Sequence, residues 1–163
     1  MTIRLLTQND WAIWKALRLE ALQDSPESFG SSFEEESKRS YINFQEDLHK
    51  NDIFGVFIHG NLVASTGFYP MRLNKKKHRG FIFAVYTKPE HRKKGIANRL
   101  IEHVIIHAKS RVIQLDLTCS TNNTAAIKMY QKNGFKICGT EPRSLKIGDQ
   151  FFDEHLMILD LDA

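Results

Sequence analysis

The stretch from Phe81 to Ala108 constrains the fold of this chain more than any other part of the sequence. Phe81–Thr87 is an almost continuous apolar run, which is typical of a buried central strand. A short basic loop follows Pro89, and Gly95 then precedes a segment whose apolar residues recur at helical spacing. The sequence therefore predicts a central strand, a charged loop and an amphipathic helix in immediate succession, the local pattern of an α/β domain.

The remaining periodicities predict one mixed sheet. Ile113, Leu115 and Leu117 alternate with polar residues, which indicates a half-buried strand, and Gly134 stands where a left-handed residue ends a helix. Further strands are predicted over Thr2–Leu6, Ile53–Ile58, Leu62–Tyr69, Phe135–Gly139 and Phe151–Leu161. Further helices are predicted after Asn9 or Asp10, within Ser31–Lys50 on a weaker pattern, and after Asn122 or Asn123. The predicted order is β-α-α-β-β-β-α-β-α-β-β, a mixed α/β fold.

Length and composition exclude several classes of protein. The 163 residues suit one hydrophobic core, so we expect a single domain over residues 1–163. Apolar residues make up 42% and charged residues 26%, which argues against a disordered, collagen-like or coiled-coil chain. No apolar run reaches the roughly 18–20 residues of a membrane span, and Met1–Asp10 lacks the apolar core of a secretory signal. With only two cysteines, Cys119 and Cys138, we expect a cytoplasmic protein with no membrane partner.

Positive charge is concentrated in one part of the chain. The formal net charge is +4, but Arg72–Arg99 alone holds ten Lys and Arg against one acid, Glu90. The rest of the chain holds 13 Lys and Arg against 18 acids and is therefore acidic. A local positive field of this kind favours a bound anion over general attraction to nucleic acid or an anionic membrane.

The basic loop and the start of the following helix have the chemistry of an anion site. Main-chain N–H groups at the start of a helix point outward, with the positive end of the helix dipole behind them. Gly95 allows close approach to the backbone, and the small Ala97 leaves room for a ligand. Arg92, Lys93 and Lys94 would add charge around a pyrophosphate.

Two motifs resemble those of the GNAT family of N-acetyltransferases. Arg92-x-x-Gly95-x-Ala97 resembles the family's R/Q-x-x-G-x-G/A acyl-CoA motif. Asn123-x-x-Ala126-x-x-x-Tyr130, followed by Lys-Asn-Gly-Phe, resembles the helix and strand that come later in the family. The order and separation of the two motifs match, and the resemblance covers essentially the whole chain. It implies a mostly antiparallel central sheet, flanked by helices and splayed at the central strand.

The resemblance also implies a cosubstrate and a set of site residues. Acetyl-CoA would be the acyl donor, and the main chain of Val85, Tyr86 and Thr87 would pair with its pantetheine arm like an added strand. Asn123 would hydrogen-bond the same arm, and Tyr130 would be the general acid for the departing thiolate. One main-chain N–H of the central strand would stabilise the oxyanion. The pyrophosphate would be held by Arg92, Lys93, Lys94, Gly95, Ile96, Ala97 and Asn98.

The general base departs from the family pattern. Many relatives carry a glutamate on the central strand or on the next one, where this chain has Phe81 and Thr118. No base is assigned from the sequence, and a water chain is one alternative. The other candidates are Asp116, Glu34, Glu35, Glu36, Asp153, Glu154 and His155.

Other motifs carry weaker signals. His103 and His107 have the i, i+4 spacing of zinc ligands but lack the glutamate of the zinc-protease motif, so no metal is expected. Lys75–Lys77 is interpreted as a solvated turn, and no recognition-helix signature indicates nucleic-acid binding. A steep salt dependence of duplex or RNA binding would support the nucleic-acid alternative.

The sequence therefore predicts an acetyl-CoA-dependent N-acetyltransferase acting on an amine of a small molecule, protein or peptide. The alternative is an acyl-CoA-binding sensor that has lost catalysis; the missing glutamates favour it and Tyr130 argues against it. Related enzymes often dimerise, which leaves a homodimer open. Acceptor choice would depend on three segments, Phe29–Lys50, Tyr69–Arg79 and Glu141–Asp153.

Overall fold

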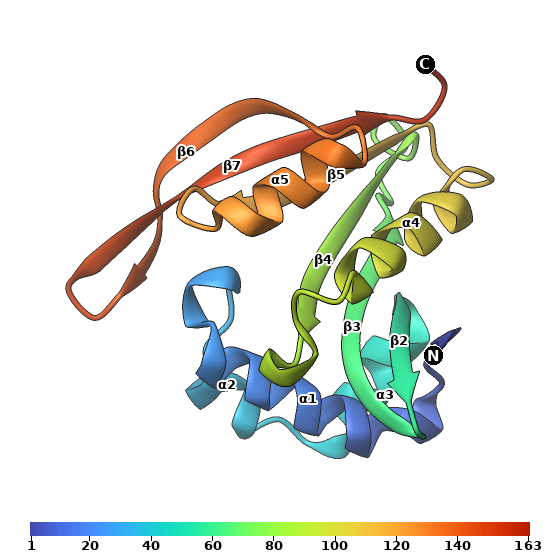
Figure 1. The fold of residues 1–163 in the computed structure, drawn as a ribbon, viewed down its shortest axis with the longest axis vertical. Helices are drawn as coiled ribbons and strands as arrows, with labels where there is room; N and C mark the ends of the chain where they lie inside the picture. Colours follow the sequence, from blue (N-terminus) through green and yellow to red (C-terminus); the bar gives the residue numbers. More distant parts are fainter.

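A seven-stranded sheet organises residues 1–163 in the computed structural model (Figure 1). Its strand order is β1-β2-β3-β4-β5-β7-β6, and only the β4–β5 pair is parallel. The strands are β1 (Thr2–Leu5), β2 (Asp52–Ile58), β3 (Asn61–Pro70), β4 (Arg79–Thr87), β5 (Gln114–Ser120), β6 (Lys136–Ile147) and β7 (Gln150–Asp160). The mixed α/β class and the mostly antiparallel sheet expected from the sequence are confirmed.

Five α-helices and three short 3-10 turns connect the strands. The helices are α1 (Trp11–Asp24), α2 (Phe33–Ser37), α3 (Tyr41–Lys50), α4 (Ile96–Ala108) and α5 (Thr124–Lys132). The 3-10 turns are η1 (Gln8–Asp10), η2 (Pro26–Ser28) and η3 (Pro89–His91). No helix is both long enough and apolar enough to cross a lipid bilayer.

Two details differ from the sequence prediction. The single weak helix expected over Ser31–Lys50 is two helices, because Ser32 and Ser40 each cap a new start by accepting a main-chain N–H. The strand expected to end at Gly139 continues to Ile147 and forms a long hairpin with β7. Figure 1 shows this hairpin projecting beyond the helices.

The two faces of the sheet are covered by different helices (Figure 1). One apolar cluster joins α4 and α5 to the sheet and includes Leu100, Ile101 and Val104, which are fully buried. A second cluster joins α1 and α3 to the other face through Trp14 and Phe44. The sheet therefore separates two layers, and any opening through it connects them.

Such an opening lies between β4 and β5. These strands pair only at Arg79–Gln114, Gly80–Leu115 and Phe81–Asp116, and they diverge beyond that point. On its other side β4 remains paired with β3, but the register shifts there, and Ala84 has a left-handed φ of 55°. The expected splay at the central strand is therefore present. It leaves the second half of β4 without a partner on the β5 side.

Candidate active site

A cavity of about 650 Å³ lies in the gap between β4 and β5. Its walls are the diverging ends of these strands, the start of α4 and the inner side of α5. The volume lies within the roughly 300–1,000 Å³ range of ligand pockets. The lining residues include nearly all those predicted from the motifs: Val85, Tyr86, Thr87, Arg92, Lys93, Gly95, Ile96, Ala97, Asn98, Asn123 and Tyr130.

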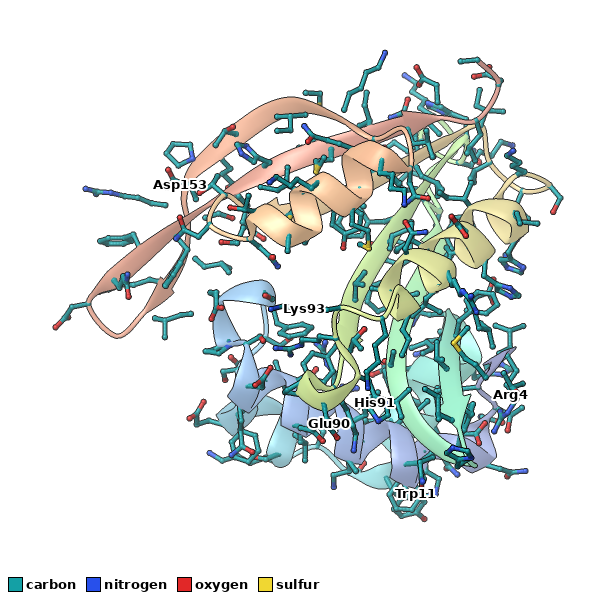
Figure 2. The ribbon with its side chains drawn as sticks, in the orientation of Figure 1. Arg4, Trp11, Glu90, His91, Lys93 and Asp153 are labelled. Carbon is teal, nitrogen blue, oxygen red and sulfur yellow. The ribbon has the colours of Figure 1, made fainter.

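The main chain at the start of α4 offers a run of free hydrogen-bond donors. No N–H from Lys93 to Asn98 donates a hydrogen bond within the protein, and no side chain caps the helix. Lys93 and Gly95 are left-handed, with φ of 60° and 76°, so the chain alternates between conformations that turn successive N–H groups to one side. This segment forms a concavity of free donors with the chemistry to hold an anion, and the side chain of Lys93 lines the same cavity (Figure 2).

Lys94 does not reach this cavity. Its ammonium donates instead to the carbonyl of Glu90 at 2.9 Å, one turn back in the loop. From the sequence, Lys93 and Lys94 are expected to act together. In the structure only Lys93 of this pair lines the cavity, because this hydrogen bond directs the Lys94 side chain away from it.

Arg92 is engaged by the protein rather than free. Its Nε donates to the Thr87 carbonyl at 2.9 Å, and its Nη2 lies 2.5 Å from Asp24 Oδ2 at the end of α1. The guanidinium also lies over the Tyr86 ring, 5.4 Å from its centroid. The hydrogen bond from Arg92 lowers the pKa of Asp24 below its ordinary value. Arg92 thus fixes the end of β4 against α1 and shapes the basic loop.

Two buried hydroxyls in the cavity wall have no protein partner. Thr87 at the end of β4 and Ser120 at the end of β5 both line the cavity, and neither hydroxyl makes a hydrogen bond. Buried polar groups are rarely left unpaired, so these hydroxyls are available to a ligand. Ser120 was not predicted from the motifs. Its only sequence signal is that it shares a strand face with Asp116 and Thr118.

The helix α5 presents the second motif to the same cavity. Asn123 caps α5 by accepting a hydrogen bond from the Ala126 N–H at 3.2 Å. Tyr130 is buried, and its hydroxyl makes no hydrogen bond within the protein. Burial, with a smaller effect of Cys119, raises the pKa of Tyr130 above its ordinary value. Burial likewise raises the pKa of the Cys119 thiol to about 11, so this cysteine is a poor nucleophile near neutral pH.

A second cavity, of about 200 Å³, lies on the α1 side of the splay. It is lined by Arg18 of α1, by Phe29, by Phe81 of β4 and by Glu154 of β7. Both cavities are lined by Ser28, Ile82, Phe83, Ala84 and Thr118. The two cavities therefore meet where β4 and β5 separate.

The sequence matches the family model of the acetyltransferase (GNAT) family over residues 14–135, which is most of the chain. The chain belongs to the GNAT acetyltransferase family. No curated protein matches its sequence.

Solved GNAT structures share the fold at low sequence identity. A GNAT-family acetyltransferase from Streptococcus pneumoniae has a TM-score of 0.87 and 22% identity, covering 98% of each chain. A ribosomal-protein-alanine N-acetyltransferase from Brucella melitensis has a TM-score of 0.87 and 21% identity, over 99% of this chain and 100% of that one. The putative acetyltransferase yncA from Salmonella typhimurium, solved with its cofactor acetyl-CoA, has a TM-score of 0.85 and 19% identity, over 100% and 95%.

Most of the candidate bases of this GNAT chain have other partners. Asp116 is buried and accepts hydrogen bonds from Arg79 and Gln114. Glu36 is paired with Arg18. Neither Asp116 nor Glu36 lines a cavity. The same is true of four further candidates: Glu34, Glu35, Asp153 and His155.

Glu154 is the one candidate base that lines a cavity. Its Oε1 accepts a hydrogen bond from the Ser144 hydroxyl at 2.5 Å, which leaves Oε2 without a protein partner. On β7 it pairs with Ser120, and Leu156 two residues later pairs with Thr118 at the junction of the cavities. Its neighbour Asp153 instead accepts the Arg143 N–H at 2.8 Å on the projecting hairpin (Figure 2).

The histidines of α4 serve structural contacts. His107 Nε2 lies 2.8 Å from Asp52 Oδ2, and Arg111 binds the same carboxylate. The His103 ring packs edge-on against Phe54 at 5.1 Å. No group of three or more His, Cys, Asp or Glu side chains is arranged to hold a metal ion.

Proposed function

We propose that this GNAT protein is an acetyl-CoA-dependent N-acetyltransferase that transfers the acetyl group directly to a primary amine. One observation carries the proposal: a large cavity with a main-chain anion site meets a small cavity with a free carboxylate at the splay of β4 and β5. Donor and acceptor would approach from opposite faces of the sheet and react at the junction. The acetyl-CoA complex of the Salmonella relative supports the choice of donor.

The residues of the large cavity fit acetyl-CoA. The free N–H groups from Lys93 to Asn98 suit a pyrophosphate, and the unpaired main chain of β4 suits the amide groups of a pantetheine arm. The hydroxyls of Thr87 and Ser120 supply further hydrogen bonds, as does the Asn123 amide, whose oxygen already caps α5. When bound, acetyl-CoA supplies an activated acetyl thioester and a thiol leaving group.

The protein's own groups then transfer protons and stabilise the negative charge that develops during the reaction. Glu154 takes a proton from the acceptor ammonium, and the neutral amine attacks the acetyl carbon as the carbon–sulfur bond breaks. A main-chain N–H of β4 near the irregularity at Ala84 stabilises the negative charge that develops on the acetyl oxygen. Tyr130 donates its proton to the departing sulfur, and the second proton that the nitrogen loses on becoming an amide returns to Tyr130 through water. The raised pKa of Cys119 argues against a covalent acetyl-cysteine step.

Thiol release from acetyl-CoA with a panel of amines tests the function. We expect turnover with at least one class among amino acids, polyamines, aminoglycosides and N-terminal peptides. The Brucella neighbour and an Escherichia coli neighbour are named as ribosomal-protein-alanine N-acetyltransferases, so a peptide beginning with alanine belongs in the panel. Tight acetyl-CoA binding without turnover of any acceptor would contradict the proposal and identify an acyl-CoA sensor.

Gly95→Ala is expected to weaken CoA binding and to destabilise the fold by about 1–2 kcal/mol. Gly95 has a φ of 76°, a conformation that costs an L-residue about that much, so the start of α4 must rearrange. Calorimetric CoA titration and thermal unfolding measure the two effects. Gly139→Ala is the matched control, because a Cβ there has open space and φ is ordinary. Equal CoA affinity in both variants would contradict the role of this helix start.

A further inference from the structure

The small cavity contains a charged donor that no protein group satisfies. Arg18 lines this cavity with only 13% of its side chain exposed. Its Nε and Nη2 donate to the two carboxylate oxygens of Glu36 at 2.8 and 3.3 Å. Its Nη1 is buried and has no hydrogen-bond partner. Because an unpaired charged donor in the interior is costly, Nη1 is the group that Arg18 has to offer a ligand.

The neighbours of Arg18 hold its guanidinium in one orientation. Glu36 is itself buried, and Arg39 approaches the same carboxylate with Nη1 at 3.6 Å from Oε1. The guanidinium of Arg18 also lies over the Phe29 ring, 4.9 Å from its centroid. A guanidinium fixed in this way loses little conformational entropy when it binds a ligand, which favours specific recognition.

The cavity also has an acidic side and apolar walls. Glu154 approaches it from β7, with Oε2 free, near the junction where transfer would occur. Phe29, Phe81 and Phe83 line the space between. The volume of about 200 Å³ is below the roughly 300–1,000 Å³ of pockets for larger ligands. The cavity thus presents a fixed cationic donor, a carboxylate and apolar surface to a small molecule.

We propose that the acceptor is an amino acid with an apolar side chain, an inference that rests on the proposed function. Its carboxylate accepts hydrogen bonds from Arg18 Nη1, since a guanidinium pairs best with a carboxylate or phosphate. Its ammonium lies beside Glu154 and is thereby directed to the junction. Its side chain contacts Phe29, Phe81 and Phe83. Arg18 is a specificity-determining residue in this scheme.

A comparison of each amino acid with its uncharged relatives tests the proposal. We would measure kcat/KM for leucine and phenylalanine, for their primary amides and for the amines that lack the carboxylate. The wild-type protein should prefer the amino acid by about 10- to 100-fold, the range expected of hydrogen bonds to a charged group. Equal turnover of acid and amide would overturn the proposal. So would a preference for amides, which indicates a peptide acceptor.

Variants of the Arg18 pair separate recognition from folding. Arg18→Lys keeps the positive charge but loses the planar set of guanidinium donors. The double variant Arg18→Met/Glu36→Gln removes the charge without leaving the Glu36 carboxylate buried and unpaired. Both should reduce the preference for the acid over the amide to about 3-fold or less. This ratio does not depend on the amount of folded enzyme. Arg39→Gln is the matched control, because Arg39 touches the same Glu36 but lines neither cavity, and it should keep the wild-type ratio.

A binding measurement distinguishes this inference from the proposed function. Calorimetric titration of leucine or phenylalanine into the CoA-bound protein should show affinity that Arg18→Lys lowers about 10-fold or more. Such binding without turnover of any acceptor would support the carboxylate site while contradicting the acetyltransferase function. Turnover of amines with no preference for a carboxylate, before or after the substitution, would leave the function standing and overturn the amino acid acceptor.

Discussion

Tyr130→Phe is expected to lower kcat about 100-fold while leaving acetyl-CoA affinity within about 3-fold. A general acid contributes roughly 100- to 10,000-fold, and the lower end applies where the leaving group is a thiolate, which departs readily. The ring of Tyr130 packs against Phe135, with centroids 5.8 Å apart, and Phe keeps that contact. The substitution therefore removes only the hydroxyl, which makes no hydrogen bond within the protein. Pre-steady-state thiol release and calorimetric titration measure the two quantities.

The pH dependence of the same variant distinguishes a hydrogen-bond donor from a titrating group. Burial raises the pKa of Tyr130 above 10, so the phenol stays protonated and able to donate throughout neutral and mildly basic pH. The pH profiles of kcat for the wild-type protein and for Tyr130→Phe should therefore have the same shape up to about pH 10 and differ only in the size of kcat. Tyr41→Phe is the matched control, since Tyr41 packs against Trp11 with the two rings tilted and lines neither cavity. A wild-type basic limb below pH 10 that disappears in Tyr130→Phe would contradict this assignment.

The fold was predictable because its strongest signals are local. The apolar run of β4 and the apolar stripe of α4 are long, and each fixes the type of its element regardless of context. The prediction failed where pairing between strands, and not the local sequence, determines the extent of an element. β6 is exposed along most of its length and contains Pro142, so it has no clean alternation, and pairing with β7 alone keeps it extended.

The candidate site was likewise predictable only where its residues lie close together in the sequence. The predicted part of the large cavity lies on one strand–loop–helix unit and one later helix, so short motifs were enough to predict residues that line it. The small cavity brings together Arg18, Phe29 and Glu154 from elements far apart in the sequence. No local pattern indicates such a grouping. The contact of Arg92 with Asp24, 68 residues away, was hidden for the same reason.

Glu154→Gln is expected to lower kcat/KM at pH 7 by about 100-fold, because glutamine cannot take a proton from the acceptor ammonium. The remaining activity should rise about tenfold per pH unit until the acceptor amine is itself neutral, near pH 8 for the α-amine of a peptide and at higher pH for that of a free amino acid, whose own carboxylate stabilises the ammonium. The unfolding temperature should change little, since the amide oxygen of glutamine can still accept from the Ser144 hydroxyl. Initial rates of thiol release from pH 6 to about 9.5 measure the profile.

Asp153→Asn is the matched control for this change. Asp153 precedes Glu154 on β7, points to the opposite face of the strand and lines neither cavity, so its variant should keep the wild-type rate and profile. Ser144→Ala adds a graded test, because it keeps the carboxylate and removes the hydrogen bond that orients it. We expect it to lower kcat/KM about 3- to 10-fold with an unchanged profile. A Glu154→Gln profile identical to that of the wild-type protein would assign proton removal to water, and Glu154 would then act only by holding the cationic acceptor at the junction.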